Sequence, residues 1–216
     1  MAENERMIRI LLVDDHNIFR QGLKEIIEST PDIKVTSEAA TGRAAIARAL
    51  SDDCDVVLLD ISMPDIHGID VLKQIKQACP AKAVIVLTMH PEEQYGLRSL
   101  KAGAAGYLNK DCEAKELLAA IRKVNKGKLY ISSYFAELIA GDLSGNKKIA
   151  PHDILSDREY QILCMIAAGK RIKDIAEQLS LSPKTVSTYR NRLLQKLNME
   201  TNEQLCTYAF NHNLLD

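Results

Sequence analysis

The sequence lacks the features that mark several classes of protein. Its five cysteines (Cys54, Cys79, Cys112, Cys164 and Cys206) lie far apart and form no C-x-x-C pair. This odd, scattered set does not suit a disulfide framework or a zinc site, and it is typical of reduced thiols in a cytoplasm. No uninterrupted apolar run approaches the roughly 20 residues of a membrane span. The acidic first residues show no signal-peptide pattern. We therefore expect a cytoplasmic protein with no membrane partner.

Net charge is also nearly absent, at −1 for 216 residues, but the charges are unevenly distributed. Residues 170–196 carry seven basic side chains against two acidic ones, an excess of five positive charges. Such an excess suggests a polyanionic partner, although charge runs are more often solvated faces. The basic side chains are Lys170, Arg171, Lys173, Lys184, Arg190, Arg192 and Lys196.

Strand-like and helix-like segments alternate through residues 1–126. The expected strands are 8–13, 33–39, 56–59, 83–87 and 105–108, and the expected helices are 17–29, 41–50, 68–78, 92–101 and 113–125. Gly127 closes the last of these helices. Five repeats of strand then helix predict a parallel sheet with helices on both faces.

Polar side chains follow four of the five expected strands. Asp14 and Asp15 follow the first strand, Asp60 the third, Thr88 the fourth and Lys110 the fifth. Because the carboxyl ends of parallel strands share one edge, these groups should converge there. Three converging carboxylates repel one another unless a cation neutralises them, and Mg²⁺ suits hard oxygen ligands beside phosphate.

This set predicts a phosphoryl-transfer site. Asp60 is the carboxylate nucleophile that forms an acyl phosphate, and Asp14 and Asp15 hold the metal. Lys110 pairs with the incoming phosphoryl charge, and the Thr88 hydroxyl donates to a phosphoryl oxygen.

Residues 7–126 resemble the receiver domain of bacterial two-component response regulators. The resemblance is carried by segments 11–16 (LLVDDH), 59–68 (LDISMPDIHG), 87–90 (LTMH) and 103–110 (GAAGYLNK). It implies a flavodoxin-like, doubly wound five-stranded sheet of order 2-1-3-4-5, an order for which a receiver is a standard example. It also implies that Asp60 accepts phosphate from a sensor histidine kinase.

The resemblance adds two further site residues. The backbone carbonyl of Ser62 would join Asp15 and Asp60 on Mg²⁺ (or Mn²⁺). Tyr107 matches an aromatic switch whose ring turns inward when Thr88 moves toward the phosphate, although it could instead be a half-buried strand aromatic.

Several positions depart from the common receiver pattern. Lys110 is followed by Asp111 where proline is usual, and a cis bond before a non-proline residue costs about 2.5–4 kcal/mol. Met89 is bulkier than the usual small residue, and His90 occupies a position where family members tune dephosphorylation. We expect His16 and His67 to be surface residues, because they lie in different loops without metal-ligand spacing.

A second domain is predicted at residues 151–216, after a linker at 127–150 that holds a short helix at 133–140. The Gly/Ser/Asn/Lys composition of 141–148 is typical of a flexible tether. Ser156 and Glu159 form a capping box, and the helix behind them ends at Gly169. Further helices are expected at 170–179, from Ser182 and Pro183 onward, and at 201–212. In this all-α, four-helix domain, two short helices joined by a tight turn, the second polar and basic on its outer face, predict a helix-turn-helix. A generic solvated helix would show the same pattern and stays open as an alternative.

Residues 151–213 resemble the LuxR-type helix-turn-helix, on segments 155–159 (LSDRE), 172–176 (IKDIA) and 182–197 (SPKTVSTYRNRLLQKL). The resemblance places Ser187, Thr188 and Asn191 where relatives touch bases. It makes Lys184, Thr185, Arg190 and Arg192 phosphate contacts. The last helix would supply the dimer surface of the DNA-bound homodimer through Leu205, Tyr208 and Ala209.

Together the two resemblances imply a NarL/FixJ-type regulator that is not an enzyme beyond its own phosphoryl transfer and dephosphorylation. Phosphorylation of Asp60 would alter receiver conformation, dimerisation and exposure of the recognition helix on double-stranded DNA. Two alternatives stay open. One is an aspartate-nucleophile phosphatase, although such enzymes usually have a second acid where Ser62 stands. The other is a receiver that works without phosphate.

Overall fold

The computed structural model describes residues 7–132, 136–137, 150–212 and 214. The chain divides into two compact units, residues 1–140 and 141–216. Within the part described, no helix is both long and apolar enough to cross a bilayer.

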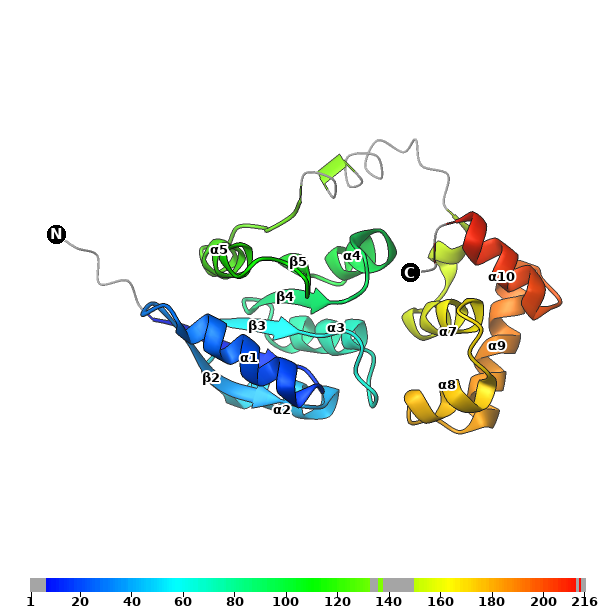
Figure 1. The fold of residues 1–216 in the computed structure, drawn as a ribbon, viewed down its shortest axis with the longest axis horizontal. Coiled ribbons are helices and arrows are strands. Elements are labelled where there is room, and N and C mark those ends of the chain that lie inside the picture. The colour runs from blue at the N-terminus through cyan, green and yellow to red at the C-terminus, as the bar shows by residue number, and fades with distance from the viewer. Residues whose placement is uncertain (1–6, 133–135, 138–149, 213, 215–216) are drawn as a thin grey trace. The chain divides into compact units, whose positions relative to one another are not determined.

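The first unit is a five-stranded parallel sheet in the order β2-β1-β3-β4-β5 (Figure 1). This order and the doubly wound architecture confirm the predicted fold. Its elements are β1 (Ile8–Val13), α1 (Asn17–Glu28), β2 (Ile33–Ala39), α2 (Gly42–Ser51), β3 (Val56–Leu59), α3 (Gly68–Ala78), β4 (Ala83–Thr88), α4 (Glu92–Lys101), β5 (Gly106–Asn109) and α5 (Ala114–Asn125).

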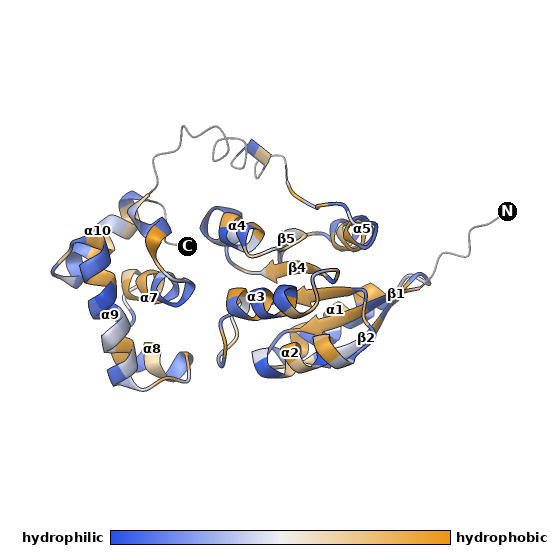
Figure 2. Ribbon diagram, turned by 180° about the vertical axis from the view of Figure 1, so that it is seen from behind, coloured by the Kyte–Doolittle hydropathy of each residue, from blue (hydrophilic) through white to orange (hydrophobic). Residues whose placement is uncertain are grey.

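Both faces of the sheet are covered, so its central strands are apolar without alternation. All four residues of β3 are fully buried, and Figure 2 shows the strands as the most hydrophobic part of this unit. Side chains of α1 and α5 share one buried cluster with one face of the sheet. Helices α2, α3 and α4 cover the opposite face (Figure 2). This double burial explains why the strands read as continuous apolar runs.

The strand register determines which residues emerge together. Val13 of β1 pairs with Leu59 of β3, so Asp14 and Asp60 are the next residues on neighbouring strands. The ladder continues past the strands, because Asp60 N donates to Val13 O (3.0 Å) and Lys110 N donates to Thr88 O (2.8 Å). Asp14, Asp60 and Lys110, which follow β1, β3 and β5, therefore emerge at one edge together with Thr88, the last residue of β4.

The second unit is helical: η1 (Pro151–Ile154), α7 (Asp157–Ala167), α8 (Ile172–Gln178), α9 (Pro183–Leu197) and α10 (Asn202–Asn211). Ser156 and Glu159 form the predicted capping box of α7, and Ser182 caps α9 with Pro183 at its first position. The core faces of α9 and α10 place Val186, Leu193 and Leu205 at zero exposure.

The predicted helix ends agree with the structure within about two residues, the usual spread at helix termini. Gly127 (φ +73°) and Gly169 (φ +78°) follow the ends of α5 and α7 in the left-handed region that glycine favours. The predicted helix at 133–140 lies largely outside the described residues. Its described members, Ala136 and Glu137, are helical.

Candidate functional site

The carboxyl edge of the sheet carries a cluster of acidic side chains. Asp14 and Asp60 are each 2% exposed, while Asp15 is half-buried. Ligand atoms of Asp14, Asp15, His16 and Asp60 all lie within 4.8 Å of one another. Three of these four residues are those predicted from the strand ends. His16 is a surface residue, as expected, and its exposed ring borders the cluster.

Lys110 lies between the two buried carboxylates. Its Nζ is 2.6 Å from Asp14 Oδ2 and 2.7 Å from Asp60 Oδ2. Burial raises the pKa of Asp60, and the Lys110 ammonium partly offsets this effect. Burial alone would lower the pKa of Lys110. The negative charges of Asp60 and Asp14 outweigh this effect, so the pKa of the ammonium is raised. Lys110 therefore holds its positive charge beside Asp60 and Asp14.

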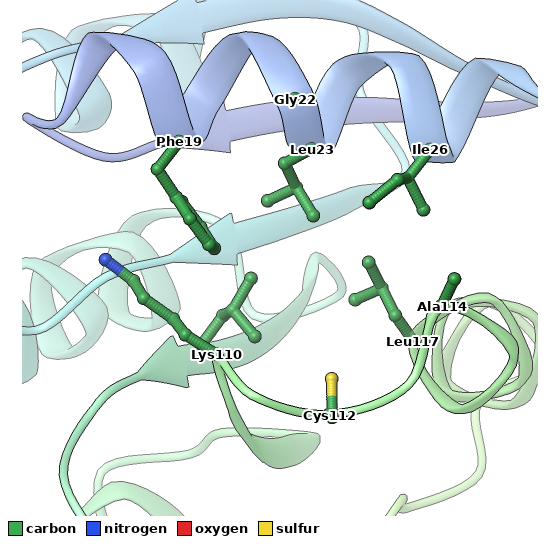
Figure 3. Close-up of a pocket in the computed structure, with 9 residues that line it drawn as sticks. Phe19, Gly22, Leu23, Ile26, Lys110, Cys112, Ala114 and Leu117 are labelled. Carbon is green, nitrogen blue, oxygen red and sulfur yellow. The ribbon is translucent and has the colours of Figure 1, made fainter.

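An apolar pocket of about 190 Å³ borders the lysine stem, between α1 and the start of α5. Figure 3 shows Lys110 extending along it, and its Nζ lies 4.7 Å from the centre of the Phe19 ring. The pocket wall is mostly apolar and offers few hydrogen-bond acceptors to an ammonium. The charged end of Lys110 therefore lies against the carboxylates. The lining residues are Phe19, Gly22, Leu23, Ile26, Leu87, Lys110, Cys112, Ala114 and Leu117.

The cluster fits a small hard cation. Asp15 Oδ1 is buried and accepts no hydrogen bond, although His16 Nδ1 lies 3.0 Å from it. An unpartnered buried carboxylate oxygen is costly unless it has a ligand. Together with Asp14 and Asp60 it supplies the carboxylate oxygens that Mg²⁺ prefers. Ser62 lies next to them, with its backbone N donating to Asp60 Oδ1 (3.0 Å).

The loop after Asp60 is fixed at its far end by Gly68. A Cβ at this position would lie 2.3 Å from Ile61 Cα and 2.6 Å from Asp60 O. Only glycine therefore lets the start of α3 lie against the backbone of Asp60 and Ile61. Within the same loop, the Asp65 carboxylate accepts from Gly42 N (2.8 Å) and Arg43 N (3.1 Å) at the start of α2. The loop after Asp60 is thus held from two helices.

The loop between β4 and α4 flanks the same site. Thr88 is fully buried, and its hydroxyl accepts from His90 N at 3.4 Å. His90 Nε2 is 3.1 Å from Ser62 Oγ, which joins this loop to the loop after Asp60. Met89 is 59% exposed beside them. The two loops that border Asp60 are therefore hydrogen-bonded to each other.

Tyr107 is buried, at 4% exposure. Its O–H donates to the backbone oxygens of His90 (2.9 Å) and Pro91 (3.3 Å). The ring therefore lies inside the unit, with its hydroxyl bonded to the chain just before α4. It is more deeply buried than the half-buried strand aromatic that was the alternative.

His67 differs from the surface position expected for it. It is 2% exposed, and its Nδ1 accepts from Ile69 N (3.3 Å) to cap α3. The ring lies 5.8 Å from that of Tyr95. Sequence spacing could exclude a metal role for His67, but only the packing of α3 against α4 shows that it is buried. Among the described residues no peptide bond is cis, that between Lys110 and Asp111 included.

A second candidate site is the outer face of α9. Lys184, Thr188, Asn191 and Arg192 are exposed there, and Thr185, Ser187 and Arg190 are half-buried. Ser187 Oγ donates to Pro183 O (2.9 Å), and Thr188 Oγ1 donates to Lys184 O (3.0 Å). Arg190 Nε donates to Asn202 Oδ1 (2.6 Å). The structure therefore brings all seven predicted residues onto one helix. Tyr189 of the same helix is half-buried.

Ion pairs reduce the charge available around α9. Lys196 Nζ lies 2.7 Å from Glu159 Oε2, and Arg171 Nε lies 2.9 Å from Asp174 Oδ2. Burial alone would raise the pKa of Glu159, but Lys196 and Ser156 lower it. Two of the seven basic residues in 170–196 are therefore neutralised within the unit. Lys184 and Arg192 remain exposed on the outer face.

The residues expected to form a dimer surface on α10 lie differently. Leu205 and Ala209 are fully buried in the unit's own core. Tyr208 is half-buried, and its hydroxyl lies 2.9 Å from His152 Nδ1. The large apolar side chain that α10 exposes is Phe210, at 72%. In this structure Leu205 and Ala209 offer no side-chain area to a partner.

Comparisons with known proteins agree with the two sites. Residues 10–122 match the family described as the response regulator receiver domain, and residues 153–209 match the luxR family of bacterial regulatory proteins. The response regulator UvrY of Escherichia coli (strain K12) is 41% identical over 209 residues, with 96% of each chain covered. The response regulator GacA of Pseudomonas aeruginosa is 36% identical, with 97% of this chain and 99% of that one covered.

Solved structures give the same result. The RcsB response regulator of Salmonella typhimurium has a TM-score of 0.57 at 27% identity, covering 94% of this chain and 98% of its own. The RcsB–DNA complex has a TM-score of 0.59 at the same identity and coverage. The receiver unit, the helix-turn-helix unit and these relatives together show that the chain belongs to the two-component response regulators of the NarL/FixJ type.

Proposed function

We propose that this protein is a phosphorylation-dependent transcription regulator whose acceptor is Asp60. The observation that carries the proposal is the placement of Lys110 Nζ within 2.7 Å of Asp60 and 2.6 Å of Asp14 at a buried sheet edge. A buried carboxylate, a fixed positive charge and further carboxylate oxygens that can hold a metal ion are parts that support phosphoryl transfer.

In the proposed step, a carboxylate oxygen of Asp60 attacks the phosphorus of a phosphohistidine on a sensor kinase. The new P–O bond forms an acyl phosphate as the P–N bond breaks, and the leaving imidazole takes up a proton. Lys110 and the Thr88 hydroxyl bind phosphoryl oxygens. Water later cleaves the acyl phosphate to inorganic phosphate and restores Asp60. This is the chain's only proposed chemistry.

Asp14, Asp15, Asp60 and the backbone carbonyl of Ser62 would hold Mg²⁺ or Mn²⁺. When bound, the ion would neutralise the negative charge on the phosphoryl oxygens. The unpartnered Asp15 oxygen supports this assignment. The chain's own contribution is to hold these oxygens in place through β1, β3 and Gly68.

The second unit would bind double-stranded DNA through α9. Ser187, Thr188 and Asn191 would contact bases, and Lys184, Thr185, Arg190 and Arg192 would contact phosphates. The hydroxyls now bonded within the helix can rotate to new partners. Dimers would form on DNA, as structures of RcsB dimers on DNA show for that protein. Residues 127–150 would link the two domains in a cytoplasmic protein.

The test is labelling of Asp60. We expect wild type to take up the phosphoryl group of acetyl phosphate in the presence of Mg²⁺, and Asp60→Asn to take up none. Asp111→Asn, an exposed acid in the Lys110 loop, serves as the control and should label normally. Equal labelling of Asp60→Asn and wild type, or labelling that is unaffected by chelation of Mg²⁺, would contradict the proposal.

A further inference from the structure

The chain does not leave the receiver unit freely after α5. The post-α5 segment, residues 128–132, runs beside β5. Tyr130 N donates to Ala105 O (2.8 Å), and Tyr130 forms a parallel bridge with Gly106. Since β5 is the edge strand of the sheet, this contact covers an edge that would otherwise be open there.

The Tyr130 side chain strengthens the contact. It packs, partly buried, against the core cluster shared by α1, α5 and the sheet. Its O–H donates to Glu116 Oε1 (3.0 Å), and burial together with this carboxylate raises the pKa of Tyr130 to about 12. A Cβ on Gly106 would lie 3.2 Å from Tyr130 O and 3.3 Å from its Cβ. The segment can therefore lie this close to β5 because residue 106 is glycine, which has no side chain.

At its other end the segment reaches α4. Ser132 Oγ donates to Glu92 Oε2 (2.6 Å), and Glu92 is the first residue of that helix. Burial raises the pKa of Glu92 above its ordinary value. Among the described residues, no cation forms an ion pair with Glu92. A half-buried carboxylate held by a hydroxyl alone is a weak contact, and it can be released at low cost.

The contacts of the segment with β5 and with α4 both connect it to the loop between β4 and α4. Pro91 caps α4 directly before Glu92, and its carbonyl accepts from the Tyr107 hydroxyl. Tyr107 is the residue after Gly106 on β5. Two consecutive residues of β5 therefore make the two contacts: Gly106 touches the post-α5 segment, and Tyr107 touches the loop that follows Thr88.

We infer that the post-α5 segment is a latch on β5 and α4 that phosphorylation of Asp60 releases. The inference rests on the proposed function. When the Thr88 hydroxyl turns from its bond with His90 N to a phosphoryl oxygen, residues 89–91 follow it toward Asp60. Glu92 moves with them, and its bond with Ser132 lengthens. Release of the latch frees the segment of chain that leads to the second unit.

The test measures hydrogen exchange of the Tyr130 amide in the full chain, with acetyl phosphate and Mg²⁺ as the probe. Mass spectrometry of the same samples reports whether Asp60 carries phosphate. We expect exchange to rise about fivefold on phosphorylation, the factor for loss of one ordinary hydrogen bond. Phosphate on Asp60 with unchanged or slower Tyr130 exchange overturns the latch alone. Absence of phosphate from Asp60 overturns the proposed function and, with it, the latch.

Variants test the latch without phosphate. Ser132→Ala should raise Tyr130 exchange in the resting protein by a similar factor and leave little further increase on phosphorylation. Ser29→Ala removes a comparable serine hydrogen bond at the end of α1 and should leave Tyr130 exchange unchanged. Equal exchange in Ser132→Ala and Ser29→Ala would overturn the latch.

Discussion

The acidic edge of the receiver and the outer face of α9 both carry polar side chains, but they hold them differently. At the acidic edge, Asp14, Asp60 and Lys110 are almost fully buried and paired with one another. On α9 the hydroxyls of Ser187 and Thr188 bond only to the backbone of their own helix, and Arg192 is exposed. One site is fixed before any ligand arrives, whereas the other can adapt its side chains to a partner.

The difference follows from what each site has to bind. A phosphoryl group is small and takes one position, so groups fixed in advance stabilise its transfer without reorganisation. DNA is a large surface whose phosphates lie at intervals along it, and exposed flexible cations suit it. Removing one group should therefore cost much at the first site and little at the second.

The largest effect should come from Lys110→Met. It leaves two buried carboxylates without their cation, and we expect the free energy of unfolding to fall by about 3–5 kcal/mol in Mg²⁺-free buffer. Uptake of phosphate from acetyl phosphate should fall at least about 100-fold. Urea unfolding and phosphate labelling measure the two effects.

Lys115→Met, on the exposed side of α5, is the matched control and should change neither quantity. Mg²⁺ should stabilise Lys110→Met more than it stabilises wild type, because the ion replaces the lost positive charge. If Lys110→Met were as stable as Lys115→Met, the acidic edge would not be the preorganised site described above.

A smaller effect is expected from Glu159→Gln, which tests a buried charge that pairs with α9. Glu159 accepts hydrogen bonds from Ser156 and forms an ion pair with Lys196. Because solvent screens the exposed end of Lys196, we expect the unfolding free energy to fall by only about 1–2 kcal/mol at pH 7. The folded-state pKa of Glu159 is lowered, so this contribution is present above its ordinary pKa and is lost as pH falls through the folded value. Urea unfolding at pH 7 and pH 4 measures it.

Lys196→Met should reproduce most of this loss, while Lys173→Met, an exposed lysine on α8, should not. A difference between wild type and Glu159→Gln that grows as pH falls would contradict the assigned pKa shift.

DNA affinity should respond still less to any single residue of α9. Arg192→Ala removes one exposed cation, and we expect binding about fivefold to tenfold weaker, with the salt-dependence slope reduced by about one. The double variant Arg171→Ala/Asp174→Ala removes a pair that is already neutral and should bind as wild type does. Titration of full-length protein on a selected DNA site at several salt concentrations gives both values. Equal losses in the two variants would show that Arg192 makes no phosphate contact.

Much of the acidic edge could be predicted because parallel strands bring their carboxyl ends to one place. Asp14, Asp60 and Lys110 needed only their position after an apolar run. His67 could not be placed, because its burial depends on Tyr95 from another helix. Leu205 and Ala209 show the same limit: their helical spacing defines a face, but only the packing of α10 shows that this face is internal. The post-α5 segment carried no periodic pattern at all.

The smallest expected effect tests whether an ion pair is strong because it is buried or because it lies in the receiver unit. Asp32 and Arg122 form an ion pair in the same unit as the acidic edge, with side chains 26% and 41% exposed. The Arg122 guanidinium holds the pKa of Asp32 at about 2, so the pair contributes above the ordinary carboxyl pKa and is lost as pH falls toward 2. Solvent screens it, and Asp32→Asn should cost about 1 kcal/mol or less at pH 7. Urea unfolding should show this difference shrinking between pH 5 and pH 3. A loss of unfolding free energy as large as that of Lys110→Met would contradict this comparison. It would mean that ion pairs throughout the receiver unit contribute strongly to stability, whether or not they are buried.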